Sequence, residues 1–408
     1  MGETVRMAQP ARVRVERLRE ASSATTLELF FDLVFVFALT QITALMADEP
    51  NGHGLLRGTL LMAVVWWCWV GYSWTSNLVK ADEGLARVTL LVAMAAMFLL
   101  ALAIPESFED LPGGLWGPTV FAFAYLVVRA VHVALFWLIS GDDPGLRRQI
   151  GRFAPTMIGG TVLLLLAANT SGTAQLLLWL AAVVADYGGT LAIGARGWRL
   201  NSARHFAERH GLIVIVALGE SIVAIGVGVT HLAISWPIVI AAILGLAVSA
   251  SLWWAYFDTA ALLGEHALSR AEGQHRVSMA RSAFTYLHLP MMLGIVMLAL
   301  GLKKVLTYVG DTEHHALSDP LYGAPLWAMY GGTAVYLLAH VGFALRCYRR
   351  LKTYRLAAAV VLVALVPLVA NLPALASLGV LSALLIALNA TESVKFREDR
   401  DEARHGEH

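Results

Sequence analysis

Eight side chains that can carry charge interrupt long apolar stretches of this sequence, and they are the first candidates for chemistry. They are Asp32, Arg129, His132, Asp186, Glu220, Asp258, His288 and His340. A charge inside a bilayer is costly, so such a group usually faces a partner, the protein interior or a water path. At ~1.5 Å per helical residue, Arg129, Asp186 and Glu220 fall at similar depths, and we expect them to meet at one level. Asp32 and Asp258 would form a shallower layer.

The first apolar stretch carries polar side chains on one face. Glu28 and Asp32 are four residues apart and share a helix face. Gln41, thirteen residues beyond Glu28, falls close to the same face. This arrangement predicts a polar stripe along a proton or cation route. The structural alternative is that the helix dipole favours Glu28 near an N-terminus and that Asp32 pairs with an arginine.

Glu220 and Arg129 also allow two interpretations. Glu220 is predicted either to carry a proton or bind a substrate, or to form a fixed ion pair with Arg129. Arg129 and His132 are three residues apart and share a face, which suits a substrate or gating site. His132, His288 and His340 are candidates for gating or for plain hydrogen bonds in the core.

The segment Glu208-Arg209-His210-Gly211 precedes the apolar stretch that holds Glu220. With His205 it resembles no established zinc signature, because His210 is five residues from His205. We expect it to cap the next helix at the inner membrane surface, with Arg209 at the headgroups. No phosphate loop, nucleophile elbow or nucleotide signature is found. The sequence predicts no metal, no cofactor and no nucleic-acid partner, and it favours no enzymatic reaction.

Composition defines the class of protein. Of 408 residues, 58% are hydrophobic and 14% are charged, whereas soluble domains are about half apolar and about a quarter charged. The two cysteines, Cys68 and Cys347, are far apart and read as buried thiols. The chain is therefore predicted to be an all-helical polytopic membrane protein in contact with the lipid bilayer.

Twelve stretches are long and apolar enough to cross a bilayer, which takes ~20 residues. The last two are joined so closely around Pro373 that they could instead form one bent or re-entrant unit, which leaves eleven spans as the alternative. The twelve are 27–47, 55–79, 88–105, 116–139, 152–169, 174–194, 211–231, 235–263, 282–304, 325–346, 355–371 and 373–393.

Lysine and arginine residues gather in alternate connections. With twelve spans, nearly all of them fall on the side of the two termini, which the positive-inside rule assigns to the cytoplasm. The predicted organisation is a basic N-terminal segment (1–26), a first six-helix unit (27–194), a cytoplasmic linker (195–210), a second six-helix unit (211–393) and a charged tail (394–408).

The two six-helix units share sequence features in the same order. Residues 33–39 match 212–218, Trp66-Trp67 matches Trp253-Trp254, and the separation of Trp116 and Tyr125 recurs in the second unit at Trp327 and Tyr336. An even number of helices per unit makes both units enter the membrane from the same side. The sequence thus predicts a parallel 6+6 internal repeat, with its axis along the membrane normal.

Two blocks resemble a known family. Residues 28–36 (ELFFDLVFV) and the segment Glu208-Arg209-His210-Gly211, followed by 217–222 (ALGESI), resemble the bacterial low temperature requirement A family. The resemblance covers residues 24–393. It implies a multi-pass protein of the bacterial inner membrane and a link to growth in the cold, and it implies no particular biochemical activity.

Two functional classes remain open at this point. The first is a secondary transporter or ion-conducting protein, in which a small solute or ion moves along Asp32, Arg129, Asp186 and Glu220. The second is a membrane-embedded lipid-handling enzyme, or a regulatory factor of the envelope in the cold. Neither the solute nor the oligomeric state follows from the sequence.

Overall fold

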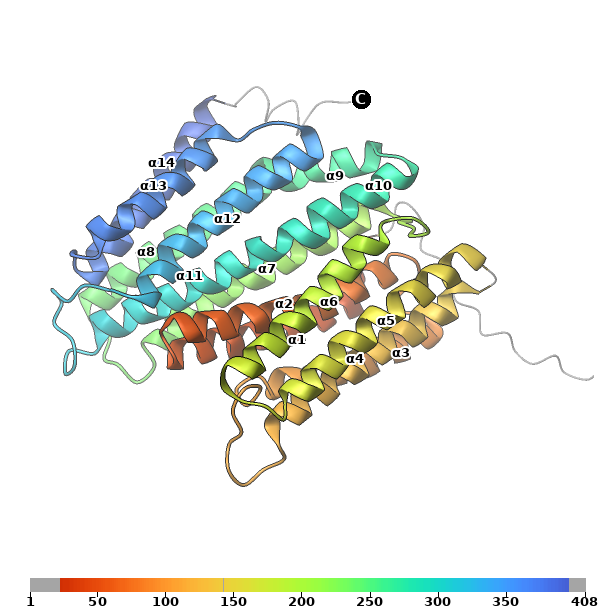
Figure 1. Ribbon diagram of the computed structural model, residues 1–408. Coiled ribbons are helices and arrows are strands. Elements are labelled where there is room, and N and C mark those ends of the chain that lie inside the picture. The colour runs from red at the N-terminus through yellow and green to blue at the C-terminus, as the bar shows by residue number, and fades with distance from the viewer. Residues whose placement is uncertain (1–22, 142, 396–408) are drawn as a thin grey trace, which may run out of the picture.

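A computed structural model describes residues 23–141 and 143–395, and every regular element within these ranges is a helix. Most of the predicted N-terminal segment and charged tail lies outside the described residues. The helices run in alternating directions and pack side by side into one bundle (Figure 1). The π-helical turns η1 and η2 each lie within a longer helix.

The bounds of the elements follow the apolar stretches. They are α1 (Thr26–Asp48), α2 (Gly52–Ser76), α3 (Gly84–Leu102), α4 (Gly117–Ser140), α5 (Pro144–Ala167), α6 (Gly172–Ile193), α7 (Ala203–Gly228), α8 (Trp236–Ala255), η1 (Tyr256–Ala260), α9 (Ala261–Arg270), α10 (Gly273–Met279), η2 (Ala280–Tyr286), α11 (Leu287–Gly310), α12 (Ala324–Tyr348), α13 (Thr353–Val369) and α14 (Ala374–Lys395).

Eleven helices among the described residues are long and apolar enough to span a membrane. The remaining predicted span, 355–371, is α13, an apolar helix of 17 residues, which is the lower limit of length for a crossing. It packs beside α14 as a separate helix. Many large apolar side chains on the outside of the bundle are exposed, among them Ile234, Trp236 and Leu368, as expected for surfaces that face lipid rather than water.

Two spans are longer than predicted. One apolar helix runs from Trp236 to Arg270 and the next from Gly273 to Gly310, so the connection expected as a loop between them is almost entirely helical. Buried Leu268 and Val277 anchor it to the core. Pro290 lies in α11, and the π-helical turn η2 ends four residues before it. A proline inside a helix removes the hydrogen bond to the carbonyl four residues earlier.

The centre of the bundle consists of α1, α2, α7 and α11. Helix α1 packs against α2, α3, α7 and α11, and α2 also contacts α4 and α6. Trp66 and Trp74 of α2 donate hydrogen bonds to the carbonyl and hydroxyl of Thr285 in η2 at 2.9 and 3.0 Å. Buried tryptophans therefore tie the N-terminal half of the chain to the C-terminal half.

Candidate functional site

Polar contacts follow the seam between α1 and α7, and they show that the two helices are parallel. Glu28, Asp32 and Thr40 on α1 meet His205, Arg209 and Glu220, which lie progressively further along α7 towards its C-terminal end. We call this line of contacts the polar seam. Its residues are Glu28, Asp32, Thr40 and Gln41 on α1 and His205, Glu208, Arg209 and Glu220 on α7.

The strongest contact of the polar seam is a bidentate ion pair. Arg209 donates from Nη1 to Asp32 Oδ2 at 2.8 Å and from Nη2 to Asp32 Oδ1 at 2.9 Å. Trp69 of α2 donates its indole N–H to Asp32 Oδ1 at 2.8 Å, and its ring lies under the guanidinium. Asp32 and Arg209 are 2% and 1% exposed. Two parallel charge-assisted bonds offset the desolvation of both groups.

Glu28 lies one turn before Asp32 and serves two purposes. Thr25 and Glu28 form a capping box that starts α1. Glu28 Oε2 also lies 3.1 Å from His205 Nε2, and Glu28 Oε1 lies 3.6 Å from Arg209 Nε. Neither Glu28 Oε1 nor Arg209 Nε has a hydrogen-bond partner. The start of α1 is thus held by the same carboxylate that faces α7.

The tautomer of His205 follows from Asn77. The Asn77 side-chain oxygen accepts from the backbone N–H groups of Asn201 and Ser202 at 2.8 and 3.2 Å, which fixes its amide as a donor towards His205 Nδ1 at 3.2 Å. His205 Nδ1 therefore accepts, and Nε2 carries the proton that is donated to Glu28. The cluster of Glu28, Asp32 and Arg209 thus holds two carboxyl groups against one guanidinium.

The expected surface cap at 208–211 is wrong. Helix α7 begins at Ala203, capped by Ser202, so residues 203–210 of the predicted linker are helical. Arg209 is buried because the carboxylates of α1 stabilise its charge there. Glu208 accepts from the Ala24 N–H at 3.1 Å, and the His210 ring packs 5.1 Å from that of Trp69. Gly211 faces the ring of Phe257.

Glu220 lies further along the seam and has a different kind of partner. Thr40 donates its hydroxyl to Glu220 Oε2 at 2.5 Å, and Glu220 is 1% exposed. Arg129 is not its partner, so the ion pair considered from the sequence is not formed. Thr40 lies eight positions beyond Asp32, or ~12 Å along the helix. Buried apolar side chains, including Phe35 and Ala217, fill this interval.

Gln41 faces an open cavity at the far end of the seam. The cavity, of about 400 Å³, is also lined by Asp48, Glu49, Arg57 and Glu109. Arg57 bridges Glu49 and Glu109 at 3.1 and 2.7 Å. Burial acts to raise the pKa of Glu49, but the hydrogen bond with His53 and the charge of Arg57 outweigh it, so this pKa is lowered. The lining of this cavity thus holds three carboxylates, Asp48, Glu49 and Glu109, against one arginine. We call the cavity the acidic mouth.

Arg129 and Asp186 meet on the other side of α2. Arg129 Nη2 lies 3.3 Å from Asp186 Oδ1, and the Tyr125 hydroxyl donates to Asp186 Oδ2. Both members of the pair are buried. A Cβ on Gly160 would lie 3.1 Å from Asp186 Oδ2, so α5 closes over the carboxylate. Two of the three groups expected at one level are thus brought together, whereas Glu220 bonds to α1.

The remaining candidates lie in separate surroundings. His288 bonds to the Tyr256 hydroxyl at 2.9 Å and to the Ala283 carbonyl at 3.1 Å. His340 Nδ1 bonds to the Tyr336 carbonyl at 2.9 Å. His132 packs its ring over Gly71. Asp258 is half-buried in η1. Over residues 23–141 and 143–395, no three His, Cys, Asp or Glu side chains are placed to hold a metal ion.

A bundle of long apolar helices with ion pairs in its interior defines a multi-pass membrane protein. The family model described as bacterial low temperature requirement A protein matches residues 23–390, and the chain belongs to this family. The chain is also similar to the uncharacterized protein RA0937 of Rhizobium meliloti (strain 1021), with 29% identity and 69% of each chain covered. No solved structure matches it.

Proposed function

We propose that this protein is a secondary transporter or ion-conducting protein of the bacterial inner membrane, and that the polar seam is the route. The observation that carries the proposal is the line of buried polar groups between α1 and α7. It runs from the net-negative cluster at Asp32, past Glu220, to the acidic mouth at Gln41. Buried ionisable groups of this kind mark ion or substrate pathways in membrane proteins.

The net charge of the Asp32 cluster favours a cationic species. Glu28 Oε1 lies 3.1 Å from His205 Nε2 and 3.6 Å from Arg209 Nε, and the cluster holds two carboxylates against one guanidinium. Binding one proton or monovalent cation would neutralise it.

Packing within each half supports the parallel 6+6 repeat. In the first half α1 contacts α2 and α3, α3 contacts α4, α4 contacts α5, and α2 contacts α6. With α7 taken as the counterpart of α1, the second half repeats each pair: α7 contacts α8 and α11, α11 contacts α12, α12 contacts α13, and α8 contacts α14. We therefore keep units 27–194 and 211–393, with 195–210 as their connection.

The orientation is also part of the proposal. Helices α1 and α7 begin on the same side, because Glu208 bonds to the residue just before α1 begins. The basic connections of the chain lie on that side. The positive-inside rule assigns it to the cytoplasm, together with both termini.

We assign Glu28, Asp32, Gln41 and Glu220 to the route. Helix α2 lies between the polar seam and the Arg129–Asp186 pair. On one side its Trp69 bonds to Asp32 of the seam. On the other side its Gly71 faces His132, which is on α4 together with Arg129. We therefore place Arg129, Asp186 and Asp258 outside the route, together with His132, His288 and His340.

Flux into proteoliposomes tests the route. The purified protein is reconstituted with an internal pH-sensitive dye, and gradients of H⁺, K⁺ and Na⁺ are imposed in turn. We expect a protein-dependent flux of at least one cation, and a decrease of about tenfold or more in Glu220→Gln, which removes the titratable group with little change of shape.

A matched control is Glu392→Gln, because Glu392 is a carboxylate paired with Arg355 between α13 and α14, away from the seam. It should keep the flux of the unmodified protein. Flux at the level of empty liposomes for all three cations, or equal flux in Glu220→Gln and the unmodified protein, would show that the seam is not the route.

A further inference from the structure

An apolar groove opens on the outside of the bundle between α4 and α5, which lie side by side at its edge (Figure 1). We call it the α4–α5 groove, and its volume is about 600 Å³. On α4 it extends from Leu126 to Leu138, and on α5 from Ala154 to Thr161. The stretch of α4 is ~18 Å long. The groove therefore covers about the depth of one leaflet, since a bilayer has a hydrocarbon core of ~30 Å.

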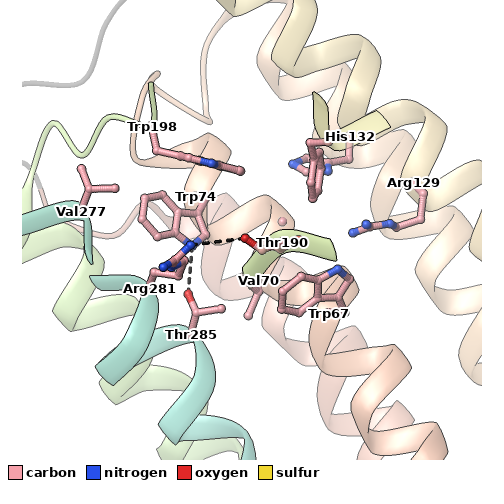
Figure 2. A pocket seen from close by; sticks show the side chains of 12 residues that line it. Trp67, Val70, Trp74, Arg129, His132, Thr190, Trp198, Val277, Arg281 and Thr285 are labelled. Carbon is pink, nitrogen blue, oxygen red and sulfur yellow. Dashed lines mark hydrogen bonds between the residues drawn. The ribbon is translucent and has the colours of Figure 1, made fainter. Parts of the chain in front are cut away.

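The lining of the α4–α5 groove suits an acyl chain. Most of the side chains that line it are apolar, and none among the described residues is a carboxylate. Arg129 also lines it, but its guanidinium points towards Trp67 of α2 (Figure 2) and pairs with Asp186. Leu138 and Ile158 of the lining are 50% and 63% exposed. The described part of the chain thus leaves the groove open to lipid.

One end of the α4–α5 groove is basic. Arg147 lies seven positions before Ala154, on the same face of α5. Its guanidinium lies 5.4 Å from the centre of the Trp137 ring, which lines the groove from α4. Arg147 and the adjacent Arg148 are both exposed. A half-exposed tryptophan at the end of a span is typical of the level of the lipid headgroups, so the two arginines lie where a phosphate group would be.

The charge at this end is not compensated within the described residues. Asp143, at the start of α5, pairs with Arg199 at 2.5 Å. Over residues 23–141 and 143–395, neither Arg147 nor Arg148 forms an ion pair. A symmetric contact with a second copy of the chain would place the same arginines on both sides of the interface. A partner with a negative headgroup and an apolar tail matches both parts of this surface.

We propose that the α4–α5 groove binds one anionic phospholipid, with an acyl chain along the groove and the phosphate at Arg147 and Arg148. Lipid chains are as apolar as the groove itself, so the groove provides shape and the arginines provide the preference for a negative headgroup. The site lies in the cytoplasmic leaflet if the proposed orientation holds. It does not depend on whether the polar seam conducts ions.

Native mass spectrometry of the purified full chain tests the site. The protein in a neutral detergent is titrated with phosphatidylglycerol or with phosphatidylcholine that carries the same acyl chains. The population with one bound lipid gives the Kd for each lipid. We expect phosphatidylglycerol to bind about tenfold or more tightly than phosphatidylcholine, because two arginines attract its headgroup.

The headgroup end is tested with one pair of variants. Arg147→Gln should weaken the binding of phosphatidylglycerol about fivefold and leave that of phosphatidylcholine unchanged. Arg152→Gln is the matched control on the same helix. Arg152 is exposed as well, but it lies one turn before Thr156, which faces Gly189 of α6 and not the groove. The control should keep the preference for phosphatidylglycerol.

The acyl-chain part is tested with a second pair. Ala134 is exposed and lines the groove from α4, so Ala134→Phe should fill the groove and remove the one-lipid complex for both lipids. Ala95→Phe is the control, because Ala95 is exposed on α3 and does not line the groove. It should bind both lipids like the unmodified protein.

Three outcomes would overturn the assignment. Equal affinity for the two lipids, or equal weakening in Arg147→Gln and Arg152→Gln, would show that the arginines form no headgroup site. Lipid binding in Ala134→Phe at the level of Ala95→Phe would show that the groove holds no acyl chain. A dimer that is lost in Ala134→Phe alone would show that a second copy covers the groove. None of these measurements involves flux, so they are separate from the test of the proposed route.

Discussion

The two ends of the polar seam keep a carboxylate inside the bundle in different ways. Asp32 has a bidentate arginine and an indole N–H. Glu220, on the partner helix, has threonine hydroxyls of α1 as its hydrogen-bonding neighbours, with Thr40 the closest. A fixed ion pair gives a carboxylate a stable charge and a rigid place. A hydroxyl partner lets a carboxylate take up or release a proton without leaving a cation unpaired. The first arrangement anchors one end of the proposed route, and the second suits a carboxylate that binds and releases a proton along it.

The largest effect is expected when the anchored end loses its cation. Arg209→Met leaves Asp32 buried without a compensating charge, which should lower the free energy of unfolding by about 3–5 kcal/mol. Denaturation in detergent micelles measures it. The double variant Asp32→Leu/Arg209→Met should recover most of that loss, because a buried ion pair can often be replaced by apolar groups. A double variant as unstable as Arg209→Met would refute the anchor.

A smaller effect is expected at the other end. Thr40→Val removes the hydroxyl and leaves Glu220 Oε2 without its donor, at a cost of about 1–3 kcal/mol in the same denaturation measurement. Thr40→Ser keeps the hydroxyl and should remain within about 1 kcal/mol of the unmodified protein. Equal losses in the two variants would mean that packing of the methyl group, and not the hydrogen bond, holds Thr40.

The smallest effect is expected beside Glu220 itself. A Cβ on Gly219 would meet nothing within 4 Å, so Gly219→Ala should leave stability unchanged or raise it by up to about 1 kcal/mol through helix propensity. Gly228 provides the contrast on the same helix, because its Cβ would lie 2.7 Å from the Lys303 carbonyl. Gly228→Ala should destabilise the protein, and the opposite order of the two variants would contradict the observed packing.

Most of the fold was predictable because it depends on local hydrophobicity. Each of the twelve apolar stretches corresponds to a helix, and their limits differ mainly where polar residues continue a helix beyond its apolar stretch. Residues 203–210 are the clearest case. Their charges suggested a surface loop, but a helix that starts at a serine cap buries them. The charge of a residue alone does not show whether its side chain is exposed or paired, because a carboxylate far away in the sequence can neutralise a buried arginine.

The sequence pointed to several residues of the polar seam but not to Thr40 or to the pairings. Asp32 and Glu220 stood out as carboxylates in apolar segments, and the possibility that Asp32 pairs with an arginine was considered. Which arginine it would be depends on α1 and α7 lying side by side in parallel. A useful signal was available: Glu28, Asp32, His205 and Arg209 all fall near the starts of the two helices that the predicted repeat would make equivalent.

The distance along the chain between Asp32 and Arg209 has a consequence for biogenesis. The two residues are 177 positions apart. At a synthesis rate of ~5–20 residues per second, Asp32 is made about 9–35 s before its partner. During that interval α1 carries Glu28 and Asp32 with neither His205 nor Arg209 available. The first helix therefore reaches its final place late, when α7 arrives, and until then the insertion machinery or water at the membrane surface must shelter its carboxylates.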